Sequence, residues 1–149
     1  MLQHLLAELE AEQARFGERR QPACTDDQVE QLRRRVREQL GAELPDAYAA
    51  FLRGRNGLNH NGLFIYASET APVVGARDAT IQGLVEANLV WRDDEDFLDC
   101  LVFGDGNMDV YVRHLPTGEY QVRDRVPGNL VERFASFDEL LAAAIKAHL

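Results

Sequence analysis

The spacing of apolar residues changes near residue 98, and this change constrains the fold more than any other feature of the sequence. Before it, leucine, valine and phenylalanine recur every three or four residues, which is the period of amphipathic helices. From residue 98 to residue 134 apolar and polar residues alternate, which is the period of strands. After residue 136 the helical period returns. Helices, then a meander of strands, then a helix predict an α+β fold with one antiparallel or mixed sheet of about five to six strands.

Helices are expected in most of the chain before this change. They cover residues 2–16, 25–40, 44–56 and 81–91, with a loop at 67–79. The first helix counts Phe16 in its apolar stripe. Thr25 and Gln28 have the spacing of a capping box at the start of the second helix. Pro45 suits the first turn of the third helix, where its missing amide hydrogen leaves no bond unmade.

Strands are expected between clusters of turn residues. The predicted strands cover residues 63–66, 98–103, 108–114, 120–122 and 130–134. Asn59 to Gly62 form the turn before the first of them, and Gly104 to Asn107 form the turn after the second. Ser136 and Glu139 then form a second capping box, which starts a final helix. No repeat and no long linker divides the chain, so its 149 residues are expected to form one domain.

Several classes of protein are excluded by the composition. No stretch approaches 18 apolar residues, so no membrane span and no membrane partner are expected. The first residues, MLQHLLAELEAEQ, contain three glutamates and begin without a basic stretch, which is unlike a signal peptide. The two cysteines, Cys24 and Cys100, cannot form a disulfide framework. The chain is therefore expected to be cytoplasmic, with both thiols reduced.

The charge is negative and unevenly distributed. Sixteen basic residues against 25 acidic ones give a net charge of −9. Residues 86–109 alone carry eight acidic residues and one arginine, which accounts for −7 of that charge. A protein of this charge does not bind nucleic acid by neutralising phosphates, so no nucleic acid partner is expected. An electrostatic partner is expected to be basic.

The densest acidic run follows the expected fourth helix. The candidate partner-binding residues are Trp91, Asp93, Asp94, Glu95, Asp96 and Asp99. One interpretation is a solvated loop between a helix and a strand. The other is a docking surface, in which clustered carboxylates imitate the phosphates that a nuclease recognises and speed the encounter with a basic partner. Trp91 is then either a buried anchor of the interface or a part of the hydrophobic core, and the sequence does not decide between them.

No metal site and no cofactor are expected from the metal-ligating residues. The four histidines His4, His60, His114 and His148 are not at ligand spacing, and there is no Cys-x-x-Cys. We interpret His60 as a turn residue and His114 as a partly buried structural residue. Asp105-x-Asn107-x-Asp109 begins like a calcium-binding loop, but Val110 and Pro116 stand where that loop needs glycine and glutamate.

No catalytic residue is assigned either. Ser68 and Ser136 are the only serines, and neither lies in a Gly-x-Ser-x-Gly motif. Cys24 has arginines nearby but no base partner, and Cys100 is expected in the core. The run Arg33-Arg34-Arg35-x-Arg37 is interpreted as the solvated face of a helix beside Glu30 and Glu38.

An ordered set of short motifs resembles the SUKH superfamily of fungal cell-wall-synthesis regulators (Smi/Knr-type) and bacterial immunity proteins. The motifs are Leu44-Pro45-Asp46-x-Tyr48-x-x-Phe51-Leu52, Asn56-Gly57, Asn61-Gly62-Leu63-Phe64-Ile65-Tyr66, Val102-Phe103-Gly104-Asp105 and Phe134-x-Ser136-Phe137-Asp138-Glu139-Leu140-Leu141. Leu84-Val85-x-x-Asn88-x-x-Trp91 is similar to the YrhA-like branch. The resemblance covers nearly the whole chain and implies a multi-stranded sheet with flanking helices.

The resemblance also implies roles for individual residues. It places Phe51, Leu52, Phe103 and Leu140 in the core. It implies that Tyr48 and Asn88 satisfy buried backbone groups and that Gly57 is a left-handed helix stop. It brings no catalytic residues and no contact surface for a partner.

Three functions of different classes remain open on the sequence. The first is a non-enzymatic immunity protein, which binds an effector toxin such as a nuclease and occludes its active site through the acidic residues. The second is a regulatory or scaffolding module that binds a cellular protein. The third is a hydrolase using Asp105, Asp109 and His114, which requires these side chains to converge in a cleft. No oligomeric state is predicted.

Overall fold

The structure is a computed structural model that describes all 149 residues. Its helices are α1 (Leu2–Arg15), α2 (Asp26–Arg35), the π-helical turn η1 (Val36–Leu40), α3 (Asp46–Gly54), α4 (Leu84–Trp91), the 3₁₀ turn η2 (Glu95–Phe97) and α5 (Phe137–His148). Its strands are β1 (Leu58–His60), β2 (Leu63–Ile65), β3 (Ala71–Pro72), β4 (Thr80–Ile81), β5 (Cys100–Asp105), β6 (Asp109–His114), β7 (Tyr120–Asp124) and β8 (Leu130–Phe134). None of the helices combines the length and apolarity that a membrane crossing requires.

The strands form a six-stranded sheet and a separate two-stranded ribbon. The order in the sheet is β1-β2-β5-β6-β7-β8, and every neighbouring pair is antiparallel. The ribbon consists of β3 and β4. The α+β fold expected from the change of period is confirmed, as are the antiparallel sheet and the C-terminal helix.

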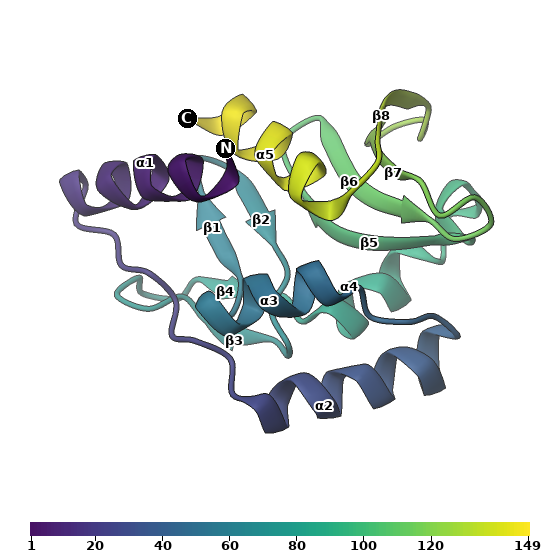
Figure 1. The fold of residues 1–149 in the computed structure, drawn as a ribbon, viewed down its shortest axis with the longest axis horizontal. Helices are drawn as coiled ribbons and strands as arrows, with labels where there is room; N and C mark the ends of the chain where they lie inside the picture. Colours follow the sequence, from purple (N-terminus) through teal and green to yellow (C-terminus); the bar gives the residue numbers. More distant parts are fainter.

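One hydrophobic core joins the helices to the sheet. Its centre is an aromatic cluster in which Phe103 of β5 lies 5.1 Å from Phe137 of α5 and 5.2 Å from Tyr48 of α3, measured between ring centroids. Figure 1 shows α1 beside α5 at one end of the molecule, with the two termini close together, and α2 at the opposite end. The core positions expected from the family resemblance, Phe51 and Leu140 among them, are buried.

The side chain of Asn88 takes the place of a strand beside β5. Strand β2 pairs with β5 only at Phe64 and Ile65, and the ladder ends with a hydrogen bond from the Tyr66 amide to Phe103. Beyond that point the Asn88 amide group donates to the Val102 carbonyl and accepts from the Val102 amide, both at 2.8 Å. This fully buried carboxamide therefore holds α4 against the sheet, as the resemblance implied.

Several boundaries differ from the sequence-based expectation. Phe16 lies beyond the end of α1 and is 74% exposed, so it does not belong to the apolar stripe. Gly57 is not the helix stop, because α3 ends at Gly54. Gly57 instead adopts φ +96° just before β1, where a Cβ would lie 3.1 Å from the Ile81 side chain. Close packing against Ile81 and the left-handed backbone together require glycine there.

The segment from residue 58 to residue 83 contains more strand than expected. Asn59 and His60 belong to β1 rather than to a turn, and only Asn61 and Gly62 make the turn to β2. Ala71 and Pro72 form β3, within the expected loop. Ile81 lies in β4, so α4 begins three residues later than the apolar spacing suggested, at Leu84. These strands have two or three residues each, which is too short for period two to be visible in the sequence.

Replacing Asn88 with alanine is expected to lower the free energy of unfolding by about 3 kcal/mol, because two backbone groups of Val102 lose their partners in a dry environment. Urea denaturation followed by circular dichroism measures the change. Asn129→Ala, at an exposed position whose side chain makes no hydrogen bond, is the control and should change stability by less than about 0.5 kcal/mol. A loss below about 1 kcal/mol for Asn88→Ala would contradict the role assigned to this side chain.

Burial raises the pKa of all four tyrosines and of both cysteines. The pKa of Tyr48 and Tyr66 rises well above the usual range, and that of the Cys100 thiol rises to about 11, in each case chiefly because burial disfavours the charged form. The pKa values of Cys24, Tyr111 and Tyr120 are raised for the same reason. The native protein therefore retains protons that the unfolded chain releases.

The contribution of these six groups to stability is consequently expected to be fully present below about pH 8 and to be lost as the pH rises further. The unfolded chain then binds fewer protons than the native one, so the free energy of unfolding has a negative slope with pH. We expect a loss of about 3 kcal/mol between about pH 8 and about pH 10.5. Urea midpoints measured across this window provide the test, and a flat or rising profile would show that these groups ionise normally in the folded protein.

Candidate partner-binding site

The acidic loop, defined here as residues 93–96, connects α4 to β5 through η2. The side chains of Asp93, Asp94, Glu95 and Asp96 are all exposed. Asp94 caps η2, since its carboxylate accepts from the Asp96 amide at 3.0 Å. Phe97, the next residue, is fully buried. The buried ring of Phe97 thus anchors the loop to the core, while the carboxylates of the loop face solvent.

The hairpin between β7 and β8 holds the acidic loop from the side. Arg123 donates to the Asp96 carbonyl at 2.8 Å. The backbone of Gly128, at φ +89°, packs so closely on Asp96 that an added Cβ would lie 2.8 Å from the Cβ of Asp96. Both contacts involve Asp96 without neutralising its carboxylate, so the loop is held in place with its charge exposed.

None of the four carboxylates of the acidic loop forms an ion pair within the chain. The 13 salt bridges of the structure involve other residues. Asp99, the last acidic residue of the run, does have a partner, because its carboxylate lies 3.2 Å from Nε2 of His114. Asp99 therefore has a partner within the chain, whereas the four carboxylates of the acidic loop form no ion pair.

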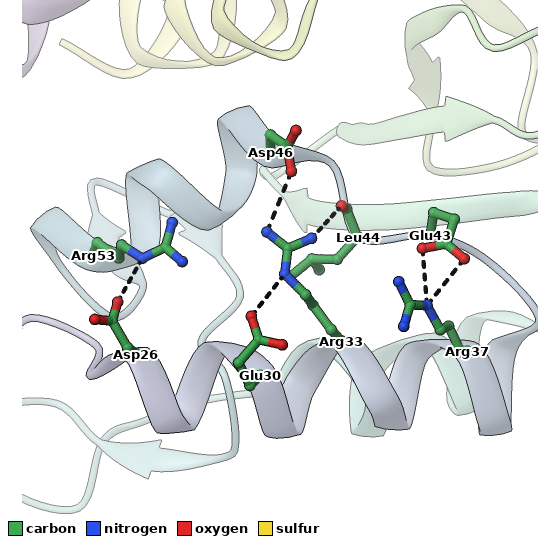
Figure 2. Close-up of polar contacts among 8 residues, drawn as sticks. All are labelled: Asp26, Glu30, Arg33, Arg37, Glu43, Leu44, Asp46 and Arg53. Atoms are coloured by element: carbon green, nitrogen blue, oxygen red, sulfur yellow. Dashed lines mark hydrogen bonds and ion pairs between the residues drawn. The ribbon is translucent and has the colours of Figure 1, made fainter.

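The arginine run in the N-terminal half behaves in the opposite way. Figure 2 shows that Arg33 reaches Glu30 at 3.4 Å and Asp46 at 3.3 Å, and that Arg37 reaches Glu43 at 3.0 Å. The Arg33–Glu30 pair lies within α2, whereas the other two pairs and the Arg53–Asp26 pair at 3.0 Å join α2 and η1 to α3 and the loop before it. The expected solvated face is present at the exposed residues Arg34 and Arg37. Arg33 and Arg35 are half-buried, and Arg35 bridges to Glu86 of α4 at 2.6 Å.

A cleft of about 510 Å³ opens beside the acidic loop. It is lined by Phe64, Tyr66, Thr80, Gln82, Ala87, Val90, Trp91, Asp94, Asp105 and Arg125. These residues come from β2, β4 and the residue after each of them, from α4, β5 and the acidic loop, and from the segment after β7. Its volume lies within the range of small-molecule and peptide side-chain pockets.

A closed ring of polar contacts forms one wall of the cleft. Trp91 Nε1 donates to the Tyr66 hydroxyl at 2.8 Å, and this hydroxyl donates to Asp105 Oδ2 at 2.5 Å. Asp105 Oδ1 accepts from Arg125 at 3.1 Å. The Arg125 guanidinium also donates to the Gly106 carbonyl at 2.7 Å and lies 5.5 Å from the centre of the Trp91 ring. Burial and the Asp105 charge raise the Tyr66 pKa, which keeps this hydroxyl neutral and able to donate.

Trp91 lies at the edge of the core and also lines the cleft. Its ring packs against Phe97 with the centroids 4.9 Å apart, at the edge of the hydrophobic core. The same side chain lines the cleft. Its indole is already hydrogen-bonded, so it presents a fixed aromatic wall rather than a side chain free to rotate into a partner.

The structure brings together five of the six candidate residues. Trp91 and Asp94 line the cleft, and the remaining carboxylates of the acidic loop are next to Asp94 in the chain, Asp93 before it and Glu95 and Asp96 after it. The sequence does not predict Tyr66 or Arg125 as site residues, and it suggests Asp105 only for calcium binding or hydrolysis. No local signal identifies them, since Tyr66 and Asp105 are 39 residues apart in the chain and meet only because β2 pairs with β5.

The residues of the hydrolase hypothesis do not converge. Asp105 lies opposite Val110 at one end of the ladder between β5 and β6, and His114 lies opposite Cys100 at the other. Asp109 lines a different depression, beside the C-terminus. That arrangement does not meet the requirement for a shared cleft. No group of three or more His, Cys, Asp or Glu side chains in the structure is arranged to hold a metal ion.

His60 is a buried link rather than a turn residue. Its ring is 1% exposed, and its two nitrogens lie 3.3 Å from carboxylate oxygens of Glu12 and Glu18. This contact ties α1 and the segment after it to β1. Both partners lie more than 40 residues away in the sequence, so nothing near His60 predicts the link.

Comparison with protein-family models finds none that matches the chain, and no curated protein matches it either.

Replacing Tyr66 with phenylalanine is expected to lower the free energy of unfolding by about 1–2 kcal/mol, because Trp91 and Asp105 both lose a hydrogen-bond partner. The emission of Trp91, the only tryptophan, should shift as water replaces the hydroxyl. Tyr111→Phe is a matched control: its hydroxyl is buried without any hydrogen bond, so its removal should be neutral or stabilising. Equal effects of the two substitutions would argue against the ring of contacts.

Proposed function

We propose that this chain is a non-enzymatic, cytoplasmic immunity protein that binds a basic effector toxin through the acidic loop and the adjoining cleft, and thereby occludes the active site of the toxin. The observation that carries the proposal is the row of exposed carboxylates at Asp93, Asp94, Glu95 and Asp96, which have no cationic partner in the chain. The motif resemblance to the SUKH superfamily supports an immunity role.

The fixed position of the acidic loop supports recognition rather than simple solubility. Four charges on consecutive exposed residues add their potentials, so an approaching cation is attracted more strongly than by a single carboxylate. Phe97 and Gly128 hold the loop from two sides, which limits the entropy lost when a partner binds. A basic active site, such as that of a nuclease, is complementary to this surface.

Exposed apolar side chains near the cleft support a protein partner. Val90, which lines the cleft, is 69% exposed, and Val126, directly after Arg125, is 85% exposed. Met108 is 77% exposed, and its carbonyl accepts from the Arg125 amide. An apolar patch beside an acidic rim is the composition expected of an interface, where charge directs the encounter and buried apolar area slows dissociation.

Affinity capture from the source cells, with this chain as bait and washes at low and high salt, tests the proposal. We expect one basic protein with a toxin-like domain, whose retention weakens with salt. Recovery of envelope or signalling proteins instead would overturn the immunity role and favour a regulatory or scaffolding module. If a toxin is recovered, its inhibition by the purified chain is measured directly.

Neutralising the acidic loop with Asp93→Asn, Asp94→Asn, Glu95→Gln and Asp96→Asn is expected to slow association with the captured toxin about tenfold at low salt. It should also flatten the dependence of the association rate on salt, since steering by these charges is lost. Stopped-flow or surface-based kinetics at several salt concentrations measure both quantities.

The matched control neutralises four exposed, unpaired carboxylates elsewhere: Asp27→Asn, Glu38→Gln, Asp78→Asn and Glu132→Gln. It changes the net charge by the same amount and should leave most of the salt dependence in place. If the two variants slow association equally, net charge rather than the acidic loop directs the encounter, and the proposed surface is wrong.

A further inference from the structure

The charges that line the cleft do not cancel. Asp105 is compensated by Arg125, with which it forms an ion pair at 3.1 Å. Asp94 is the third charged residue of the lining, and its carboxylate accepts only a backbone amide hydrogen. The cleft therefore carries a formal charge of about −1, next to the other carboxylates of the acidic loop, and is complementary to a single positive charge.

Neutral acceptors face the same cavity. The side chains of Thr80 and Gln82 line the cleft and make no hydrogen bond in the structure. A hydroxyl and a carboxamide oxygen can each accept from an N–H group. Arginine carries five such donors in a planar fork, so one guanidinium could use Asp94 and these two groups together.

The cleft already accommodates one guanidinium on its opposite wall. Arg125 lies against the Trp91 ring, with its N–H groups directed to Asp105 and Gly106. The remaining walls include the partly exposed Phe64 and the exposed Val90, which suit the aliphatic stem of a long basic side chain. The volume of about 510 Å³ leaves space for a second side chain of this kind together with part of the segment that carries it.

We propose that the cleft is a binding site for an arginine side chain of the partner, whose guanidinium pairs with Asp94 and whose stem packs on Val90 and Phe64. The inference rests on the proposed function, which it deepens by naming the group that enters the cleft. An anionic group is disfavoured, because the charge of Arg125 is already paired with Asp105 and the surrounding carboxylates repel it.

The position of the only tryptophan makes the site directly measurable. Trp91 lines the cleft, so its fluorescence reports occupancy without a label. The probe is the capped tripeptide acetyl-Gly-Arg-Gly-amide, and the matched probe replaces arginine with citrulline, which has nearly the same shape and no charge. We expect a saturable change with the arginine peptide, with a dissociation constant on the order of 1 mM, and no saturation with the citrulline peptide over the same range.

Two substitutions should change this affinity in opposite directions. Asp94→Asn removes the uncompensated charge and should weaken binding about fivefold. Arg125→Gln leaves Asp105 uncompensated and should tighten binding about threefold. Asp138→Asn, on α5 beside Leu2 and away from the cleft, is the control and should leave the affinity unchanged.

The absence of a saturable response, equal binding of the citrulline peptide, or an unchanged affinity in Asp94→Asn would each overturn the inference. Such a failure is distinguishable from failure of the proposed function, which is tested by the association of the captured toxin with the neutralised acidic loop. If that association slows while the arginine peptide does not bind, the acidic loop directs the toxin and the cleft takes no arginine. If neither responds, both proposals are wrong.

Discussion

The hydrogen bonds between the Asn88 side chain and the backbone of β5 are the contacts on which the candidate site depends. Strand β2 leaves the sheet after Ile65, and the carboxamide of Asn88 satisfies Val102 in its place. A helix thereby lies where a strand would otherwise continue. Trp91 lies on the same helix, three residues after Asn88, and is brought to the hydroxyl of Tyr66. The cleft forms where α4 and the end of β2 lie side by side next to β5.

The arginine-bearing helices and the acidic loop differ in whether their charges are compensated by other side chains of the chain. The arginines of α2, η1 and α3 are largely matched by carboxylates of the same elements or their neighbours, as in Figure 2, so they join helices instead of attracting a partner. The acidic loop has no such matching. An exposed pair contributes little to stability, whereas a group of uncompensated charges produces a potential that reaches into solvent. Four of the uncompensated carboxylates are therefore adjacent in one exposed loop, where they can direct an encounter.

Prediction from the sequence succeeded where the signal was local. The change of period identified the α+β fold, and the density of acidic residues identified an exposed loop after α4. It failed for the two-residue and three-residue strands, where no period can develop, and for His60, whose partners are Glu12 and Glu18. Nothing in the sequence around Tyr66 or Arg125 indicates that these residues belong to the site. Tyr66 meets Asp105 because β2 and β5 are neighbours in the folded sheet, and Arg125 reaches Asp105 from the segment after β7.

The sequence alone determined the fold class, the one acidic segment and the presence of a tryptophan beside it, because periodicity and charge density are properties of consecutive residues. Only the tertiary structure decided that Trp91 belongs both to the core and to a cleft, that Asp99 is paired with His114, and that Asp94 is left without a cation. Whether a charge is compensated depends on which side chains lie within about 4 Å of it, and strand pairing and helix packing bring those neighbours from distant parts of the chain.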